Sequence, residues 1–221
     1  DDISKNYHIN ADKIDVVYNG INEGFKPLSN IEQQKVREQY SQGKPYFLFV
    51  GSQSPRKNLN RLVAAFDVFK EQSQSDYKLV LVGAVYSSVG DVKRVIDKSK
   101  YKSDIIFTGR QLQHELEKIM ASAFALAFVP YFEGFGIPIV EALQCETPVI
   151  CSRTTSMPEI AGDVGLLVNP YEVKSISDGM LELFHNQKLR NQLIENGKER
   201  KNLFSWDKSA DLLWNSITKC L

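Results

Sequence analysis

The chain has 221 residues, of which 43% are hydrophobic and 24% charged, a composition typical of a soluble globular protein. Lys plus Arg and Asp plus Glu number 27 each, so the overall charge does not attract a polyanion, and we expect no nucleic-acid partner. The sequence contains no run of about 18 apolar residues, so no transmembrane segment is predicted. The amino terminus lacks the pattern of a signal peptide.

The cysteines indicate the redox compartment of the protein, and the first residue indicates whether the chain is complete. Cys145 and Cys151 lie in apolar runs and Cys220 lies at the end, with no CxxC pair. We therefore expect free thiols in a reducing compartment and a cytoplasmic protein. The sequence begins with Asp1 rather than methionine, so we also expect a fragment of a longer protein.

Short β-rich apolar runs alternate with longer segments of helical period. The runs predict strands at residues 14–19, 46–51, 78–83, 104–109, 124–130, 147–152 and 165–170. Apolar residues at three- and four-residue steps predict helices at 58–72, 89–100, 113–123 and 137–145, and then helices alone at 172–186, 188–203 and 206–221. This order predicts an α/β fold: a Rossmann-like parallel sheet with helices on both faces and a helical tail over about 171–221.

The region between the first two predicted strands is the most linker-like part of the chain. Residues 27–45 are polar, and we predict a surface excursion there within a single domain of residues 1–221. Because open α/β sheets bind ligands at the carboxyl ends of their strands, functional residues are to be sought just after each strand.

The loop after the second predicted strand, "GSQSPRKN", places Arg56 and Lys57 before a helix for which Asn58 is the expected N-cap. Cations at a helix amino terminus oppose the helix dipole, which favours an anion between them. Arg offers a bidentate fork and Lys a point charge, so phosphate is the obvious candidate. A solvated loop tip is the alternative.

The stretch "YFEGFGIPIVEAL" follows the fifth predicted strand and brackets a glycine-rich bend with Glu133 and Glu141. Gly134 and Gly136 permit unusual backbone conformations, and Pro138 suits a first helical turn. The amides of residues 135–137 then form an anion or sugar-hydroxyl site at a helix amino terminus. The alternatives are that both glutamates merely cap the helix and favour its dipole, or that they form a glycosidase-like pair.

Several other sites are excluded or weakly indicated. The three histidines have no metal-ligand spacing, and His114 is expected on a helix surface. Arg153 and Glu159, in the loop after the sixth predicted strand and the short helix that follows, give a weak signal. No GxSxG, P-loop or dinucleotide GxGxxG pattern occurs.

Several motifs, in a fixed order, resemble the carboxyl-terminal, donor-binding half of glycosyltransferase family four, retaining enzymes of the GT-B fold. The matching segments are "VVYNGI", "FVGSQSPRKNLNRLVAAF", "LVLVGA", "IIFTGR" and "VPYFEGFGIPIVEALQCETPVICSRTTSMPEIAGDVGLLVNP". They cover nearly all of the chain.

The resemblance assigns roles to these residues. It implies that Arg56 and Lys57 stabilise the diphosphate of a nucleotide-sugar in place of a divalent metal, so no metal cofactor is expected. Glu133 would face the donor sugar and Glu141 would hold the ribose. The remaining donor-binding residues would be Gly51, Ser52, Arg110, Leu112, Gly134, Phe135, Gly136 and Ile137, with Arg110 and Leu112 beside the nucleobase.

The chain departs from the family pattern at two positions. Ser52 stands where many relatives have arginine, so one phosphate contact is missing or moved. Glu146 stands where glycine is usual, so we expect a different termination of the helix that ends at Cys145.

The resemblance also implies what is missing. The family's amino-terminal acceptor domain is absent, so this chain alone is expected to bind donor but to transfer poorly. The acceptor, a glycan or lipid-linked glycan, would be held through that domain, which could also place the protein at the inner membrane face.

The leading hypothesis is a hexosyltransferase in bacterial polysaccharide or lipopolysaccharide assembly with GDP-mannose as preferred donor. A non-catalytic nucleotide-sugar-binding module is the second hypothesis, and another GT-B reaction, epimerase or phosphorylase, the third.

Overall fold

The computed structural model describes residues 2–84 and 90–219, so the start of the predicted helix 89–100, the end of the helix 206–221 and Cys220 lie outside it. The chain divides into two compact units, Glu23–Lys201 and a smaller unit of Asp1–Asn22 with Asn202–Leu221. None of the described helices has the length and apolar character needed to cross a bilayer.

The larger unit is built on a six-stranded sheet in which every pairing is parallel. The strands are β1 Tyr46–Val50, β2 Lys78–Val82, β3 Ile105–Gly109, β4 Ala125–Phe128, β5 Val149–Ser152 and β6 Gly165–Val168, in the order β3-β2-β1-β4-β5-β6. The central strands are buried on both faces, as their continuous apolar runs predict. Six of the seven predicted strands are thus confirmed, together with the fold class.

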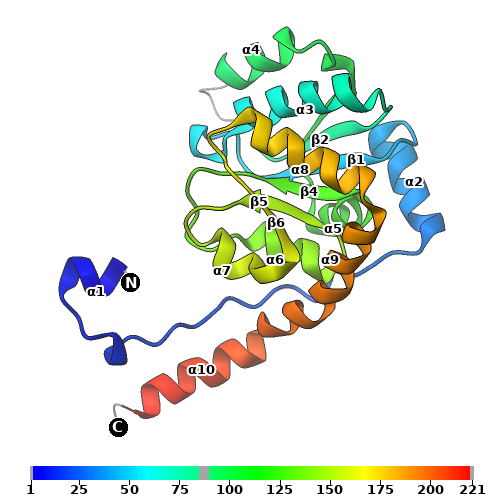
Figure 1. The fold of residues 1–221 in the computed structure, drawn as a ribbon. Helices are drawn as coiled ribbons and strands as arrows, with labels where there is room; N and C mark the ends of the chain where they lie inside the picture. Colours follow the sequence, from blue (N-terminus) through cyan, green and yellow to red (C-terminus); the bar gives the residue numbers. More distant parts are fainter. Residues whose placement is uncertain (1, 85–89, 220–221) are drawn as a thin grey trace. The chain divides into compact units, whose positions relative to one another are not determined.

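Helices cover both faces of the sheet (Figure 1). One face carries α3 Leu59–Ser73 with α4 Gly90–Lys98 and α8 Val173–His185 packed beside it. The other carries α5 Gln113–Ser122, α6 Ile137–Gln144 and α7 Met157–Ala161, with α2 Asn30–Ser41 against α5 and α9 Gln187–Arg200 against α6. The predicted helical tail therefore covers the sheet with α8 and packs on α6 with α9.

Residues 27–45, predicted as a polar surface excursion, contain the helix α2, which the sequence analysis did not predict. Ser29 and Glu32 form a capping box: the Ser29 N–H donates to the Glu32 carboxylate at 3.0 Å, and the Glu32 N–H donates to Ser29 Oγ. Few α2 side chains are buried, so the helix has little of the apolar periodicity that reveals other helices. The Ser-x-x-Glu spacing was the available signal.

The predicted strand at residues 14–19 is also wrong: the smaller unit holds α1 Asp2–Tyr7 and α10 Trp206–Thr218, and residues 14–19 form no strand. They lie along α10 instead, where Ser209 Oγ donates to the Tyr18 carbonyl at 2.5 Å and Lys219 pairs with Asp15 at 2.6 Å. β-Branched residues favour an extended backbone, but a strand also needs a partner.

We predicted that Glu146, in place of the usual glycine, would change how α6 ends, and this prediction is wrong. Glu146 itself adopts the left-handed conformation, with φ of 57°. Its N–H donates to the Leu143 carbonyl and the Thr147 N–H donates to the Ala142 carbonyl at 2.9 Å, which is a Schellman motif. The glutamate thus takes the conformation that glycine usually supplies, and Lys198 and Lys201 lie within 4 Å of its carboxylate.

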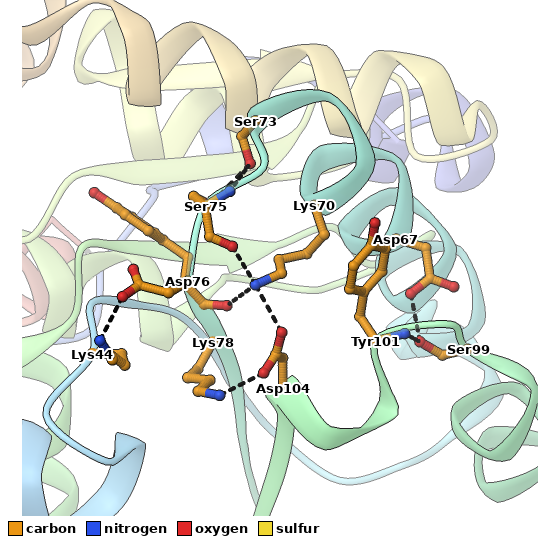
Figure 2. Close-up of polar contacts among 11 residues, drawn as sticks. Lys44, Asp67, Lys70, Ser73, Ser75, Asp76, Lys78, Ser99, Tyr101 and Asp104 are labelled. Atoms are coloured by element: carbon orange, nitrogen blue, oxygen red, sulfur yellow. Dashed lines mark hydrogen bonds and ion pairs between the residues drawn. The ribbon is translucent and has the colours of Figure 1, made fainter.

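A buried ion cluster lies at the amino ends of the strands, opposite the expected ligand edge (Figure 2). Asp104 accepts from Lys78 Nζ at 2.5 Å and from Lys70 Nζ at 2.7 Å. Lys70 Nζ also donates to the carbonyls of Ser75 and Tyr77. The cluster joins the end of α3 to the starts of β2 and β3.

Candidate functional site

The strand order reverses direction between β1 and β4, so the loops after these two strands diverge around a crevice at the carboxyl edge of the sheet. These loops are 51–58, with the two predicted cations, and 129–136, with Glu133 and the glycines. The fold therefore brings together two segments that are more than 70 residues apart.

Asn58 occupies the N-cap position of α3, as predicted, but its side chain fastens the cation loop to the sheet instead of making a cap bond. It adopts φ of 61°. Its buried Nδ2 donates to the Val129 carbonyl at 2.9 Å and to the Pro170 carbonyl at 2.7 Å. One side-chain amide thus joins the start of α3 to the segments that follow β4 and β6.

The two cations meet Glu133 across the crevice. Lys57 Nζ lies 2.6 Å from Glu133 Oε1, and Arg56 Nη1 pairs with the same oxygen. Arg56 also donates to the Phe132 carbonyl at 3.1 Å, and the Tyr131 N–H donates to the Arg56 carbonyl at 2.8 Å. The alternatives of a solvated cation loop and a helix-capping Glu133 are therefore wrong for Lys57 and Glu133, whose side chains are 10% and 13% exposed.

The glycine-rich bend leads directly into α6, whose N-cap is Gly136 with φ of 107°. This left-handed conformation favours glycine, and a Cβ at Gly136 would also lie 2.7 Å from Met157 Cε, so the end of the Met157 side chain would have to shift. Ser156 Oγ donates to the carbonyls of Glu133 and Phe135 at 2.9 and 3.0 Å. Gly134 and Ile137 are exposed at this bend, where the first turn of α6 offers amide donors to an anion.

A cavity of 720 Å³ opens beside the cations, between the ends of β1, β2 and β3 and the start of α5. Four predicted donor-binding residues line it together: Gly51, Ser52, Arg110 and Leu112. Gly51 also touches Lys57, since a Cβ at Gly51 would lie 3.4 Å from Lys57 Cε. The cavity and the cation cluster therefore adjoin each other.

Sequence reasoning missed Gly83, which lines the same cavity, as does Gln111 in the predicted segment "TGRQL". A Cβ at Gly83 would lie 1.8 Å from the Gly51 carbonyl oxygen, so the backbones after β1 and β2 touch. The glycine that ends "LVLVG" was the available signal for this close approach.

Glu141 lies on α6 and does not line the cavity. Burial, with a contribution from the negative charge of Glu117 on α5, raises the pKa of Glu141 to about 7. Gln113, which lines the cavity, donates to the Glu117 carboxylate at 3.1 Å. Glu141 is thus a half-buried carboxyl group, and within residues 2–84 and 90–219 the charge that acts on it is the negative charge of Glu117.

The raised pKa predicts how Glu141→Gln changes stability with pH. Glu141 keeps its proton in the folded chain up to about pH 7, whereas it loses this proton in the unfolded chain above pH 4.5. The free energy of unfolding therefore decreases as the pH rises from 4.5 to about 7. We expect Glu141→Gln to melt about 6–12 °C higher than the wild type at pH 8 and equally at pH 4, in thermal unfolding followed by circular dichroism. Glu195→Gln, at an exposed glutamate, is the control, and an unchanged difference across this range would contradict the prediction.

The fold and the site define a class of protein. The strand order is that of a doubly wound nucleotide-binding sheet, and cations and a helix amino terminus meet at its switch point. The chain belongs to the family Glycosyl transferases group 1, which matches residues 30–200. The described residues contain no cluster of His, Cys, Asp and Glu able to hold a metal ion.

Known proteins similar to the chain agree with this assignment. It is 29% identical over 209 residues to O-antigen chain mannosyltransferase B of Escherichia coli, covering 93% of the chain and 54% of that protein. A structure of Anabaena Alr3699/HepE in complex with UDP has a TM-score of 0.87 and 19% identity, covering 97% of this chain and 60% of that one.

A third similar protein is matched over nearly its whole length. The C-terminal domain of a glycosyl transferase group 1 family protein, LpcC from Francisella tularensis, has a TM-score of 0.71 and 23% identity, and the match covers 82% of this chain and 96% of that one. The chain spans about half the length of the curated relatives it matches.

Proposed function

We propose that the chain is the donor-binding domain of a retaining hexosyltransferase that binds a nucleotide-diphosphate sugar. The observation that carries the proposal is the meeting of Arg56, Lys57 and the α6 amino terminus at the switch point, beside a cavity of 720 Å³. Cations and helix amides stabilise a departing phosphate by preorganised charge, which is the main demand of glycosyl transfer from such a donor.

Each candidate residue has a place in this proposal. The diphosphate binds Arg56, Lys57 and the amides of Phe135, Gly136 and Ile137, with Gly134 giving the bend its freedom. The nucleobase lies in the cavity lined by Arg110 and Leu112, and Gly51 and Ser52 connect cavity and cations. Glu141 accepts from the ribose hydroxyls, and Glu133 faces the sugar. The acceptor is a glycan or glycolipid bound with a further domain.

The proposed donor is GDP-mannose, because curated relatives at 29% and 30% identity are named O-antigen chain mannosyltransferases. A uridine donor is the alternative, since the structure of Alr3699/HepE holds UDP. Calorimetric titration of the chain with GDP-mannose, UDP-glucose and UDP-N-acetylglucosamine separates them, and no heat with a guanosine ligand would reject the mannose donor. We also propose that binding needs no metal, so added EDTA should leave the titrations unchanged.

A non-catalytic nucleotide-sugar-binding module is the second candidate, because the chain spans about half of the relatives' length. Sequencing the flanking gene decides between them. A preceding open α/β domain of roughly 150 residues would support the transferase, and its absence would support the binding module.

A further inference from the structure

Two cations share one carboxylate oxygen in the candidate site. Glu133 Oε1 accepts from both Lys57 Nζ, at 2.6 Å, and Arg56 Nη1, although the two cations are assigned to a diphosphate in the proposed function. Charge-assisted bonds to a carboxylate and to a phosphate use the same donors in the same geometry. The carboxylate and a phosphate oxygen therefore compete for the same two donors.

Lys57 makes this competition strong because its side chain is 10% exposed. Its Nζ lies 4.9 Å from the centre of the Phe128 ring, and its stem lies against Gly51. Within the described part of the chain, Glu133 is the carboxylate at ion-pair distance from Lys57. A buried ammonium group without a counter-charge is costly, so one anion or another must occupy this position.

The backbone of Glu133 is held independently of its side chain. Ser156 Oγ donates to the Glu133 carbonyl at 2.9 Å, and the Glu133 N–H donates to Thr155 Oγ1 at 3.4 Å. These bonds anchor the loop to the start of α7. The carboxylate can therefore leave the cations by rotation of its side chain while the loop stays in place.

We propose that Glu133 is an internal stand-in for the donor diphosphate: its carboxylate neutralises Arg56 and Lys57 in the free chain and is displaced when the diphosphate binds. This inference rests on the proposed function and adds a control of affinity to it. Displacement turns the Glu133 carboxylate away from the cations when the donor is present. Both cations bind Oε1, so displacement frees this oxygen of the Glu133 carboxylate to accept from a sugar hydroxyl.

The test measures binding of GDP, UDP and inorganic pyrophosphate, which lack the sugar, by calorimetry. Removal of the competing charge in Glu133→Gln should tighten binding of a nucleotide diphosphate about tenfold, equivalent to ~1.4 kcal/mol. Glu172→Gln removes the same charge from the same edge of the sheet without touching either cation, and should change binding less than twofold. In the Lys57→Met background, Glu133→Gln should give a much smaller gain.

The outcomes separate the inference from the proposed function. Equal or weaker binding by folded Glu133→Gln, in a chain whose wild type binds GDP or UDP, overturns the inference and leaves the proposed function standing. Absence of binding by every folded variant overturns the proposed function. Should Glu133→Gln not fold, Glu133→Asp, whose shorter side chain holds the cations less well, must still bind more tightly than the wild type.

Discussion

Lys57→Met is expected to weaken binding of a nucleotide diphosphate by about 100-fold, or ~2.7 kcal/mol. The substitution keeps the length of a side chain that lies over Phe128 but removes a nearly buried positive charge. The measurement is calorimetric titration with GDP and UDP. Lys174→Met, at a lysine whose side chain is 83% exposed and paired with Asp178, is the matched control and should bind as the wild type does.

The Lys57 prediction also distinguishes charge from geometry. Lys57→Arg keeps the charge but places a planar fork in a space filled by a narrow stem, so binding should be intermediate. Wild-type affinity in Lys57→Met would show that the buried cation serves the fold alone.

Asp104→Asn is expected to lower the free energy of unfolding by about 3–5 kcal/mol at pH 7, since it leaves Lys70 and Lys78 buried without a counter-charge. The three side chains are 5% to 17% exposed. Asp76→Asn is the matched control, because the Lys44–Asp76 pair shown in the same close-up is 46% and 62% exposed and should contribute less than about 1 kcal/mol (Figure 2). Urea unfolding of the three proteins measures the difference.

The loss in Asp104→Asn should depend on pH. Burial raises the pKa of Asp104, but the hydrogen bonds and charges of Lys70 and Lys78 outweigh burial and lower the pKa below its ordinary value. The stabilisation is therefore complete at neutral pH and is lost as the pH falls through the lowered pKa. The difference between wild type and Asp104→Asn should narrow below about pH 4, and a constant difference down to pH 2 would contradict the assigned ion pairs.

Much of the fold could be predicted because the strands and helices of a doubly wound sheet have recognisable local sequence patterns. Strands buried on both faces give short continuous apolar runs such as "YFLFV". The missed helix α2 and the wrongly predicted strand at 14–19 are segments whose local sequence pattern does not reflect their tertiary contacts. Helix α2 buries few side chains and so lacks periodicity, and residues 14–19 have strand composition without a neighbouring strand.

The candidate site was less predictable because its bonds join distant segments. Loop chemistry indicated an anion site near Arg56 and Lys57, but nothing local indicates that Glu133, 77 residues beyond Arg56, pairs with them. Asn58 looked like an ordinary N-cap because its type and position fit one. Its actual partners lie 71 and 112 residues away, and such contacts follow from sheet topology alone.

The amide of Asn58 gives the proposed site a preorganised phosphate cradle. Because this one side chain ties the cation loop to the segments after β4 and β6, the sheet fixes the spacing of the cradle before any ligand arrives, and little loop ordering is left to oppose binding. A cradle of fixed width suits the diphosphate common to every such donor and cannot tell guanosine from uridine. Under the proposed function, discrimination between bases falls to residues 110–113, which line the cavity, and substitutions there should change the preferred donor.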